Sequence, residues 1–384
     1  MKEERKRILK MVEKGTITVE EALTLIEKLE AEYKEKKGTS EHKEGPKVTI
    51  LSKKDDPLFE EDEKVFEDSK QQYTNSQSFQ QAKHKLLDFV DLAVKKIKEI
   101  DLDLQWAKGI EISHIFQHTD AEISEVEFDI PYGSLKLTPW EQKEVRIECQ
   151  AKVYKVENQD EARDVFLKSS VFSVKDGKLR FVSQPKILKV DAHAYIPKQE
   201  YDLIWAKLFN GSFKSESLQS KKNIIKSVNG SIQIDGIRGE NVDAESTNGK
   251  ISLNNCSVEN LEGESINGKL VASGEFKKVD LQCLNGSVNC DIHNLDVNTV
   301  RLKAGTGGIN LALPKGIPAQ GELKTNMGNV NVNLEADVHV EKSEVLQKQV
   351  TFQTEKTAEQ KAYIFAESKT GSINISEVKA RQEV

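Results

Sequence analysis

The sequence predicts a mainly β protein with a parallel β-solenoid of about 19–21 residues per coil, preceded by a helical hairpin, a linker and an amphipathic helix. The solenoid rests on a recurring phrase: a small residue, any residue, Asn, Gly, then Ser or Lys, followed by an apolar–polar–apolar triplet. Successive turn glycines are 19, 19, 19, 18, 21 and 21 residues apart: Gly211, Gly230, Gly249, Gly268, Gly286, Gly307 and Gly328. A nearly constant period with one turn signal is typical of stacked coils.

The turn phrases predict how each coil bends. The clearest are Asn229-Gly230, Asn248-Gly249, Asn267-Gly268 and Asn285-Gly286. Because Gly adopts positive φ at no steric cost and Asn tolerates it, we expect a left-handed corner there. We interpret the 43-residue interval from Gly328 to Gly371 as two coils with one motif lost. The asparagines form either a ladder exposed along one edge or an internal stack whose amides bond to one another.

Asn-Gly is also the strongest hairpin signal, so an antiparallel sandwich is the rival fold. Hairpins tolerate variable loop spacing, whereas coils stacked in register do not, and three consecutive intervals of 19 favour the solenoid. We place it at residues 206–378, after a β-rich part at 105–205. That part should contain a helix at about 159–169 and strands at 110–116, 126–130, 135–137, 145–153, 171–174, 179–182 and 190–196.

Residues 1–36 predict a helical hairpin. Gly15 and Thr16 separate two helical stretches, and Thr18-Val-Glu-Glu21 matches a capping box. Two short helices bury too little surface to be stable alone, so their apolar side should contact a partner, a second copy or the rest of this chain. The residues expected there are Ile8, Val12, Leu25, Ile26 and Leu29.

Residues 37–78 are charged and poor in apolar positions, and predict a disordered linker. Residues 79–104 then predict an amphipathic helix. Its apolar side includes Phe79, Leu86, Leu87, Val90, Val94 and Ile97, and its basic residues include Lys83, Lys95 and Lys96. Such a helix either covers the exposed last coil of the solenoid or lies on an anionic membrane or partner surface.

Composition restricts the possible functions. A net charge of −7 argues against nucleic-acid binding, which needs a basic surface. No signal peptide or transmembrane segment is evident, so we expect any membrane contact to be peripheral. Four cysteines without CxxC spacing indicate a reducing, cytoplasmic compartment. Cys256, Cys283 and Cys290 occupy positions that hold small or apolar residues in neighbouring coils, which predicts buried core thiols.

No catalytic constellation, cofactor or metal site is predicted. Gly263–Leu270 nearly matches a phosphate-binding loop, but Leu270 stands where Ser or Thr is needed. His114 and His118 lie on an expected strand, where we expect a structural or surface role. Some parallel β-helices are polysaccharide-cleaving enzymes with acidic residues on one long face, whereas acidic residues here are scattered over several columns: Asp235, Asp243, Asp291 and Asp296.

Two segments resemble a known family. Residues 15–26 resemble the N-terminal hairpin of YvlB/LiaX-type proteins of Gram-positive bacteria. Ile196-Pro-Lys198, followed by Phe209-Asn-Gly-Ser212 and the later Asn-Gly coils, resembles the adhesin-like β-solenoid domain of these proteins. The resemblance implies a non-enzymatic binding or regulatory role in the cell-envelope stress response. The alternative is a polymer-forming or surface adhesin solenoid.

Overall fold

The computed structural model describes residues 47–51, 109–184, 188–344, 347–354, 358 and 360–378. The chain divides into two compact units, Met1–Gly45 and Pro46–Val384, and all described residues belong to the second. The predicted hairpin and amphipathic helix therefore lie outside the described residues.

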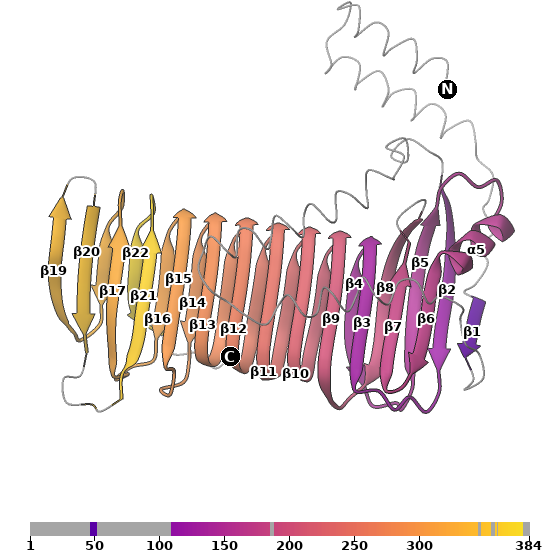
Figure 1. Cartoon of the computed structure of the whole chain (residues 1–384), viewed down its shortest axis with the longest axis horizontal. Helices are drawn as coiled ribbons and strands as arrows, with labels where there is room; N and C mark the ends of the chain where they lie inside the picture. Colours follow the sequence, from indigo (N-terminus) through magenta and orange to yellow (C-terminus); the bar gives the residue numbers. More distant parts are fainter. Residues whose placement is uncertain are drawn as a thin grey trace, which may run out of the picture. The chain divides into compact units, whose positions relative to one another are not determined.

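The first described elements form the β-rich part predicted before the solenoid, and its strands and helix are confirmed (Figure 1). They are β1 (Lys47–Leu51), β2 (Ile110–His118), β3 (Glu125–Tyr132), β4 (Leu135–Trp140), β5 (Val145–Val153), α5 (Gln159–Lys168), β6 (Ser170–Lys175), β7 (Lys178–Ser183), β8 (Leu188–Pro197) and β9 (Glu200–Asn210). The predicted disordered linker is wrong at β1, a short strand that pairs in parallel with β2.

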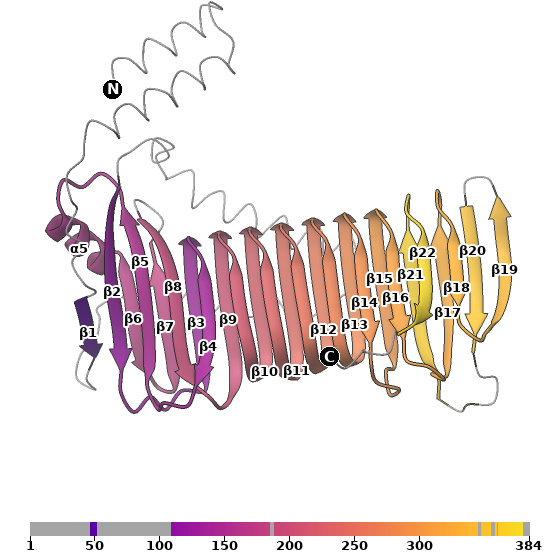
Figure 2. The same cartoon turned by 180° about the vertical axis from the view of Figure 1, so that it is seen from behind.

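The remaining strands form the repeating stack (Figure 2). They are β10 (Phe213–Asn229), β11 (Ile232–Asn248), β12 (Ile251–Asn267), β13 (Leu270–Asn285), β14 (Val288–Ile292), β15 (Thr299–Thr306), β16 (Ile309–Leu313), β17 (Ala319–Thr325), β18 (Val330–Asn333), β19 (Asp337–Glu344), β20 (Gln347–Gln353), β21 (Ala362–Ser368) and β22 (Ile373–Glu377).

The strands line up in two faces that enclose the core. We call face A the row β1-β2-β5-β8-β4-β10-β11-β12-β13-β14-β16-β22-β18. Face B is the row β6-β7-β3-β9-β10-β11-β12-β13-β15-β21-β17-β20-β19. The long strands β10–β13 take part in both. Neighbours in the middle of both rows are parallel, which confirms the solenoid.

The 19-residue period is the stacking register. Phe213 pairs with Ile232 and Ile232 with Ile251, so equivalent side chains form continuous columns inside the stack. The cysteines follow these columns, because Cys283 pairs with Ser265 and Cys290 with Ala272. All four cysteines are free and buried, and burial raises the pKa of each thiol. The prediction of core thiols is confirmed.

Of the four glycines predicted to have positive φ, Gly286 has it, at 148°, whereas three are needed for a different reason. The φ angles of Gly230, Gly249 and Gly268 lie outside the left-handed region. A Cβ built on Gly249 would instead lie 2.0 Å from the carbonyl oxygen of Gly230, and one on Gly268 would lie 2.0 Å from that of Gly249. The residue is therefore selected by close contact between coils, and the predicted positive-φ corner is wrong at these positions.

The left-handed corner lies elsewhere in the coil. Ser217, Gly236 and Asn255 have φ of 55°, 76° and 52°, and they recur at the 19-residue period. The next coil is one residue shorter at this corner, because the register shifts and Gly274 pairs with Cys256. This deletion accounts for the single interval of 18 between Gly268 and Gly286.

One coil is stacked out of sequence order. The coil of β21 and β22 lies between the coil of β15 and β16 and that of β17 and β18, with parallel pairing on both sides. Antiparallel strands β19 and β20 extend face B beyond β17. The interpretation of the 43-residue interval as two coils with a lost motif is therefore wrong. The interval holds a hairpin, followed by a return to the interior of the stack.

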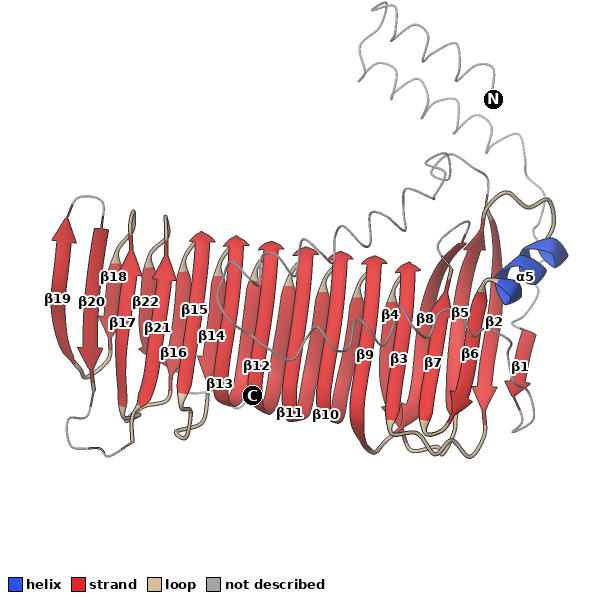
Figure 3. Ribbon diagram, viewed as in Figure 1, coloured by secondary structure: helices blue, strands red, loops and turns tan. Residues whose placement is uncertain are grey.

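The other end of the stack has the same kind of insertion and a helical cover. Strands β3 and β4 lie between β7 and β8 on one side and β9 and β10 on the other. Helix α5, the blue helix of Figure 3, packs on β2, β5 and β6. Its Phe166 lies 5.8 Å from Phe116, and Phe116 lies 5.2 Å from Phe172, measured between ring centroids. Described residues thus supply the cover of this end.

Gly249→Ala tests the contact between coils. We expect it to lower the free energy of unfolding by about 3 kcal/mol or more, because the new methyl group would overlap the carbonyl of Gly230 and separate two coils. Asn248→Ala at the adjacent position should cost only about 1–2 kcal/mol, the worth of its two exposed amide hydrogen bonds, to Asn229 and from Asn267. Urea denaturation followed by circular dichroism measures both, and equal losses would contradict the steric explanation.

Ser217→Gly tests the left-handed corner. Removal of the Cβ from a residue at φ 55° should relieve strain of about 1 kcal/mol, so the variant should be more stable than the parent. The equivalent change at Gln219, which lies outside the set of positive-φ residues, should be neutral or destabilising through added chain entropy. A lower melting temperature for Ser217→Gly would show that the corner is not strained.

Candidate functional site

The outer side of face B carries buried side chains where a solenoid normally meets solvent. Ile225 pairs with Ala206 and Ala244 in an interior column. Because side chains alternate along a strand, its neighbours Ile224 and Lys226 point outward. Ile224 pairs with Asp243 on the next coil, and Asp243 pairs with the exposed Glu262 on the coil after that, so this outward-facing column continues along the stack.

We name six of these outward-facing residues the covered patch. Each is buried: Trp205, Ile224, Lys226, Val228, Glu245 and Thr247. Trp205 is 6% exposed and Ile224 5%, although both point away from the core. The patch spans β9, β10 and β11 and combines apolar surface with a lysine and a carboxylate. A buried tryptophan among aliphatic side chains is typical of the centre of a binding interface, whereas a lysine and a carboxylate are unusual there and need each other as partners.

An ion pair crosses the covered patch. Lys226 Nζ donates to Glu245 Oε1 at 2.7 Å, and both side chains are nearly inaccessible to solvent. Isolated charges are costly to bury, so each partner depends on the other. Among the described residues, no donor reaches Glu245 Oε2 or the buried Thr247 hydroxyl. These two buried polar atoms are thus left without a hydrogen bond by the described residues.

Carboxylates cluster beside the covered patch on the next coils. Glu264 follows Glu245 in the same column, and Asp243 and Asp280 lie in the neighbouring one. Burial and the negative charges of Glu245, Asp243 and Asp280 raise the pKa of Glu264 to about 8, against a smaller opposing effect of Lys226. Glu264 is therefore protonated at neutral pH, and the edge of the patch is acidic.

The asparagine ladder is exposed and bonded to itself at the same time. The side-chain amide of Asn248 donates to Asn229, that of Asn267 to Asn248 and that of Asn285 to Asn267, at 2.7–2.8 Å. All four asparagines are exposed. Each of the two alternatives from the sequence thus describes part of the arrangement, and the amides act mainly to join coils.

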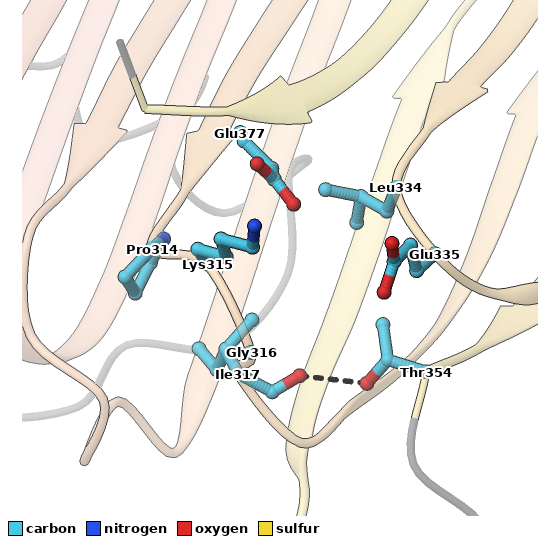
Figure 4. A pocket seen from close by; sticks show the side chains of 8 residues that line it. All are labelled: Pro314, Lys315, Gly316, Ile317, Leu334, Glu335, Thr354 and Glu377. Carbon is cyan, nitrogen blue, oxygen red and sulfur yellow. Dashed lines mark hydrogen bonds between the residues drawn. The ribbon is translucent and has the colours of Figure 1, made fainter. Parts of the chain in front are cut away.

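A small cleft lies near the β19–β20 end of the stack (Figure 4). Its volume is about 300 Å³, and it is lined by Pro314, Lys315, Gly316, Ile317, Leu334, Glu335, Thr354 and Glu377. The hydroxyl of Thr354 donates to the carbonyl of Ile317 at 2.6 Å, so its proton is already used in a hydrogen bond within the fold. The cleft thus offers one lysine and two carboxylates around an apolar wall.

The two sequence motifs that resemble metal-binding or phosphate-binding sites lie on β-strands. His114 and His118 lie buried on β2, and burial together with Arg163 lowers the pKa of His114 to about 4. Gly263–Leu270 runs through the end of β12 into β13, without the helix that a phosphate-binding loop requires. Within the described ranges, no group of three or more His, Cys, Asp or Glu residues could hold a metal ion.

The residues predicted for partner and membrane contact lie outside the described residues. This applies to Ile8, Val12, Leu25, Ile26 and Leu29 of the hairpin, and to Phe79, Leu86, Leu87, Val90, Val94, Ile97, Lys83, Lys95 and Lys96. Of the described helices, none has the length and hydropathy of a membrane span. The covered patch was missed, although two apolar residues in succession, Ile224 and Ile225, signal a strand buried on both sides.

Comparison with known proteins decides the family. The family model Toastrack DUF4097 matches residues 168–376, and a SHOCT-like domain model matches residues 3–34. The chain is 44% identical over 376 residues to the uncharacterised protein YvlB of Bacillus subtilis (strain 168), with 98% of this chain and 99% of YvlB aligned. The chain belongs to the Toastrack family.

Two solved structures are also similar to this Toastrack chain. One, from Clostridium sporogenes ATCC 15579, is provisionally named a cell adhesion protein; it is 17% identical, covers 71% of this chain and all of its own, and gives a TM-score of 0.24. The other, from Bacteroides fragilis NCTC 9343 and provisionally named an adhesin, is 12% identical, covers 71% of this chain and 97% of its own, and gives 0.32.

The raised pKa of Glu264 makes the stability of this Toastrack protein depend on pH. The folded state keeps the proton up to about pH 8, whereas the unfolded chain loses it near pH 4.5. The contribution of Glu264 to stability is thus fully present below pH 4.5 and falls as the pH rises to 8. Glu264→Gln, which mimics the protonated acid, should lose less stability than the parent between pH 5 and pH 8.

Melting temperatures across this pH range measure the effect. Glu275→Gln, at an exposed position on the next coil, is the matched control and should follow the parent curve. A parent and a Glu264→Gln variant with parallel curves would show that Glu264 is ionised in the folded protein.

Proposed function

We propose that this protein is a non-enzymatic binding or regulatory protein of the bacterial cell-envelope stress response. It acts through protein or membrane-surface contacts. The observation that carries the proposal is the covered patch, where Trp205 and Ile224 point out of the solenoid and are nonetheless buried. Apolar side chains on the outer side of a solenoid mark a surface for association, with another part of the chain or with a partner.

The other parts of the chain have complementary roles in this proposal. The hairpin at residues 1–36, where the SHOCT-like model matches, binds a protein partner or a second copy through Ile8, Val12, Leu25, Ile26 and Leu29. The amphipathic segment at 79–104, whose five lysines lie between residues 83 and 98, brings the protein to an anionic membrane from the cytoplasmic side, as a peripheral contact. The role in envelope stress rests on the resemblance to YvlB/LiaX-type proteins, and the 44% identity to YvlB supports that resemblance.

The alternative is a polymer-forming or surface adhesin solenoid. It is favoured by the outer edge of β18, which pairs with no other described strand, and by the exposed Val338 and Val340 on β19. An open strand edge beside apolar side chains is a template for pairing with another chain. Light scattering distinguishes this alternative, because end-to-end stacking produces large assemblies that grow with protein concentration.

Co-sedimentation with vesicles tests the membrane contact. The full-length protein should pellet with phosphatidylglycerol vesicles at low salt and be released at high salt, because screening weakens the attraction of lysines to anionic lipid. A variant lacking residues 79–100 should stay in the supernatant, and one lacking residues 3–36 should pellet like the parent. If the parent stays in the supernatant at every salt concentration, the membrane role is wrong and binding must be to protein.

A further inference from the structure

We propose that the covered patch is the docking surface for residues 79–100 of the same chain. The segment would lie along the outer side of face B, across the coils of β9 to β12, and not over an end of the solenoid. This inference goes beyond the proposed function and does not depend on it, since it concerns the protein without a membrane or a partner.

The described elements leave the outer side of the patch without a cover. Strands β9 to β12 pair with one another and with β3, β4 and β13, all of which continue the stack. Helix α5 packs on β2, β5 and β6. Trp205 and Val228 are nevertheless buried, and we infer that residues outside the described ranges cover them.

The chemistry of the patch restricts what can cover it. Its apolar part needs an apolar partner, and within the described structure Glu245 Oε2 and the Thr247 hydroxyl lack hydrogen-bond partners. Buried polar atoms nearly always have one, so the cover must also bring donors. The carboxylates of Asp243, Glu262 and Asp280 beside the patch favour a cover with positive charge.

Residues 79–100 meet these requirements. Their apolar residues recur at helical spacing, and five lysines stand against Asp88, Asp91 and Glu99, a net charge of +2 (5 − 3). Residues 52–78 are poor in apolar positions and carry eight acidic residues against four lysines, a net charge of −4 (4 − 8). The ranges 101–108 and 379–384 are short.

The segment is long enough to cover the patch. A helix of 22 residues is about 33 Å long, more than twice the three strand spacings between β9 and β12, which amount to about 14 Å. Residues 101–109 connect the segment to β2 and can span up to roughly 30 Å. Along face A, β2 and β10 are four strand spacings apart, or about 19 Å, so the connection is long enough to bring the segment to the level of β10 in the stack.

Tryptophan fluorescence tests the docking from the side of the patch. In full-length protein with Trp106→Phe and Trp140→Phe, Trp205 is the remaining tryptophan. We expect weak acrylamide quenching, which rises severalfold with a shift of emission to longer wavelength when Leu86, Leu87 and Val90 are changed to Glu. The matched control changes Leu25, Ile26 and Leu29 of the hairpin to Glu and should leave quenching low. Unchanged quenching in the first variant, or increased quenching in the control, would overturn the proposal.

Limited trypsin digestion tests the same contact from the side of the segment. Cleavage after Lys83, Lys85, Lys95, Lys96 and Lys98 should be slow in the parent and at least tenfold faster in Ile224→Glu, with Tyr363→Glu on an exposed part of face B as control. Circular dichroism confirms that the variants keep the β-sheet signal. Equally fast cleavage in the parent and Ile224→Glu would refute docking. Both experiments are done without lipid, so their outcome is independent of the vesicle test.

Discussion

The contact on which the stack depends is the approach of one turn glycine to the carbonyl oxygen of the glycine in the neighbouring coil. A Cβ at Gly230 would lie 2.0 Å from the carbonyl oxygen of Gly211. The same carbonyl accepts a hydrogen bond from Ser227 at 3.1 Å, and the thiol of Cys283 approaches the carbonyl of Gly268 at 2.9 Å. The small residue that precedes each Asn-Gly pair is thus part of the same contact. Together these groups fix the register, from which the straight interior columns follow.

Much of the fold could be predicted because the repeat is recorded in consecutive intervals of 19 residues. The interior positions of Cys256, Cys283 and Cys290 followed from that register alone. The reason for glycine at the bends could not be inferred, since a left-handed corner and a close backbone contact select the same residue. The true left-handed corner was harder to recognise because it is occupied in turn by Ser217, Gly236 and Asn255. Only glycine and asparagine favour that conformation.

The candidate site and the ends of the stack could not be predicted from the sequence, for another reason. A repeat shows the order in which coils are synthesised, whereas their order in space also depends on which edges can pair. The 43-residue interval before Gly371 fits a skipped motif as well as a returning chain. The covered patch left a weak signal in Trp205-Ala206 and Ile224-Ile225, where apolar residues break the alternation of a strand with one solvated side. A cover on the second side explains the break.

The inserted coil of β21 and β22 has a consequence for how the protein is made. Strands β17 to β20 leave the ribosome before residues 362–377, yet β17 and β18 pair with β21 and β22 in the finished structure. From β9 to β16 the growing chain can add coils one by one, and it must then keep a place open. The last coils therefore cannot be stacked in the order in which they are synthesised. Their unpaired strand edges need protection until β21 and β22 have been made.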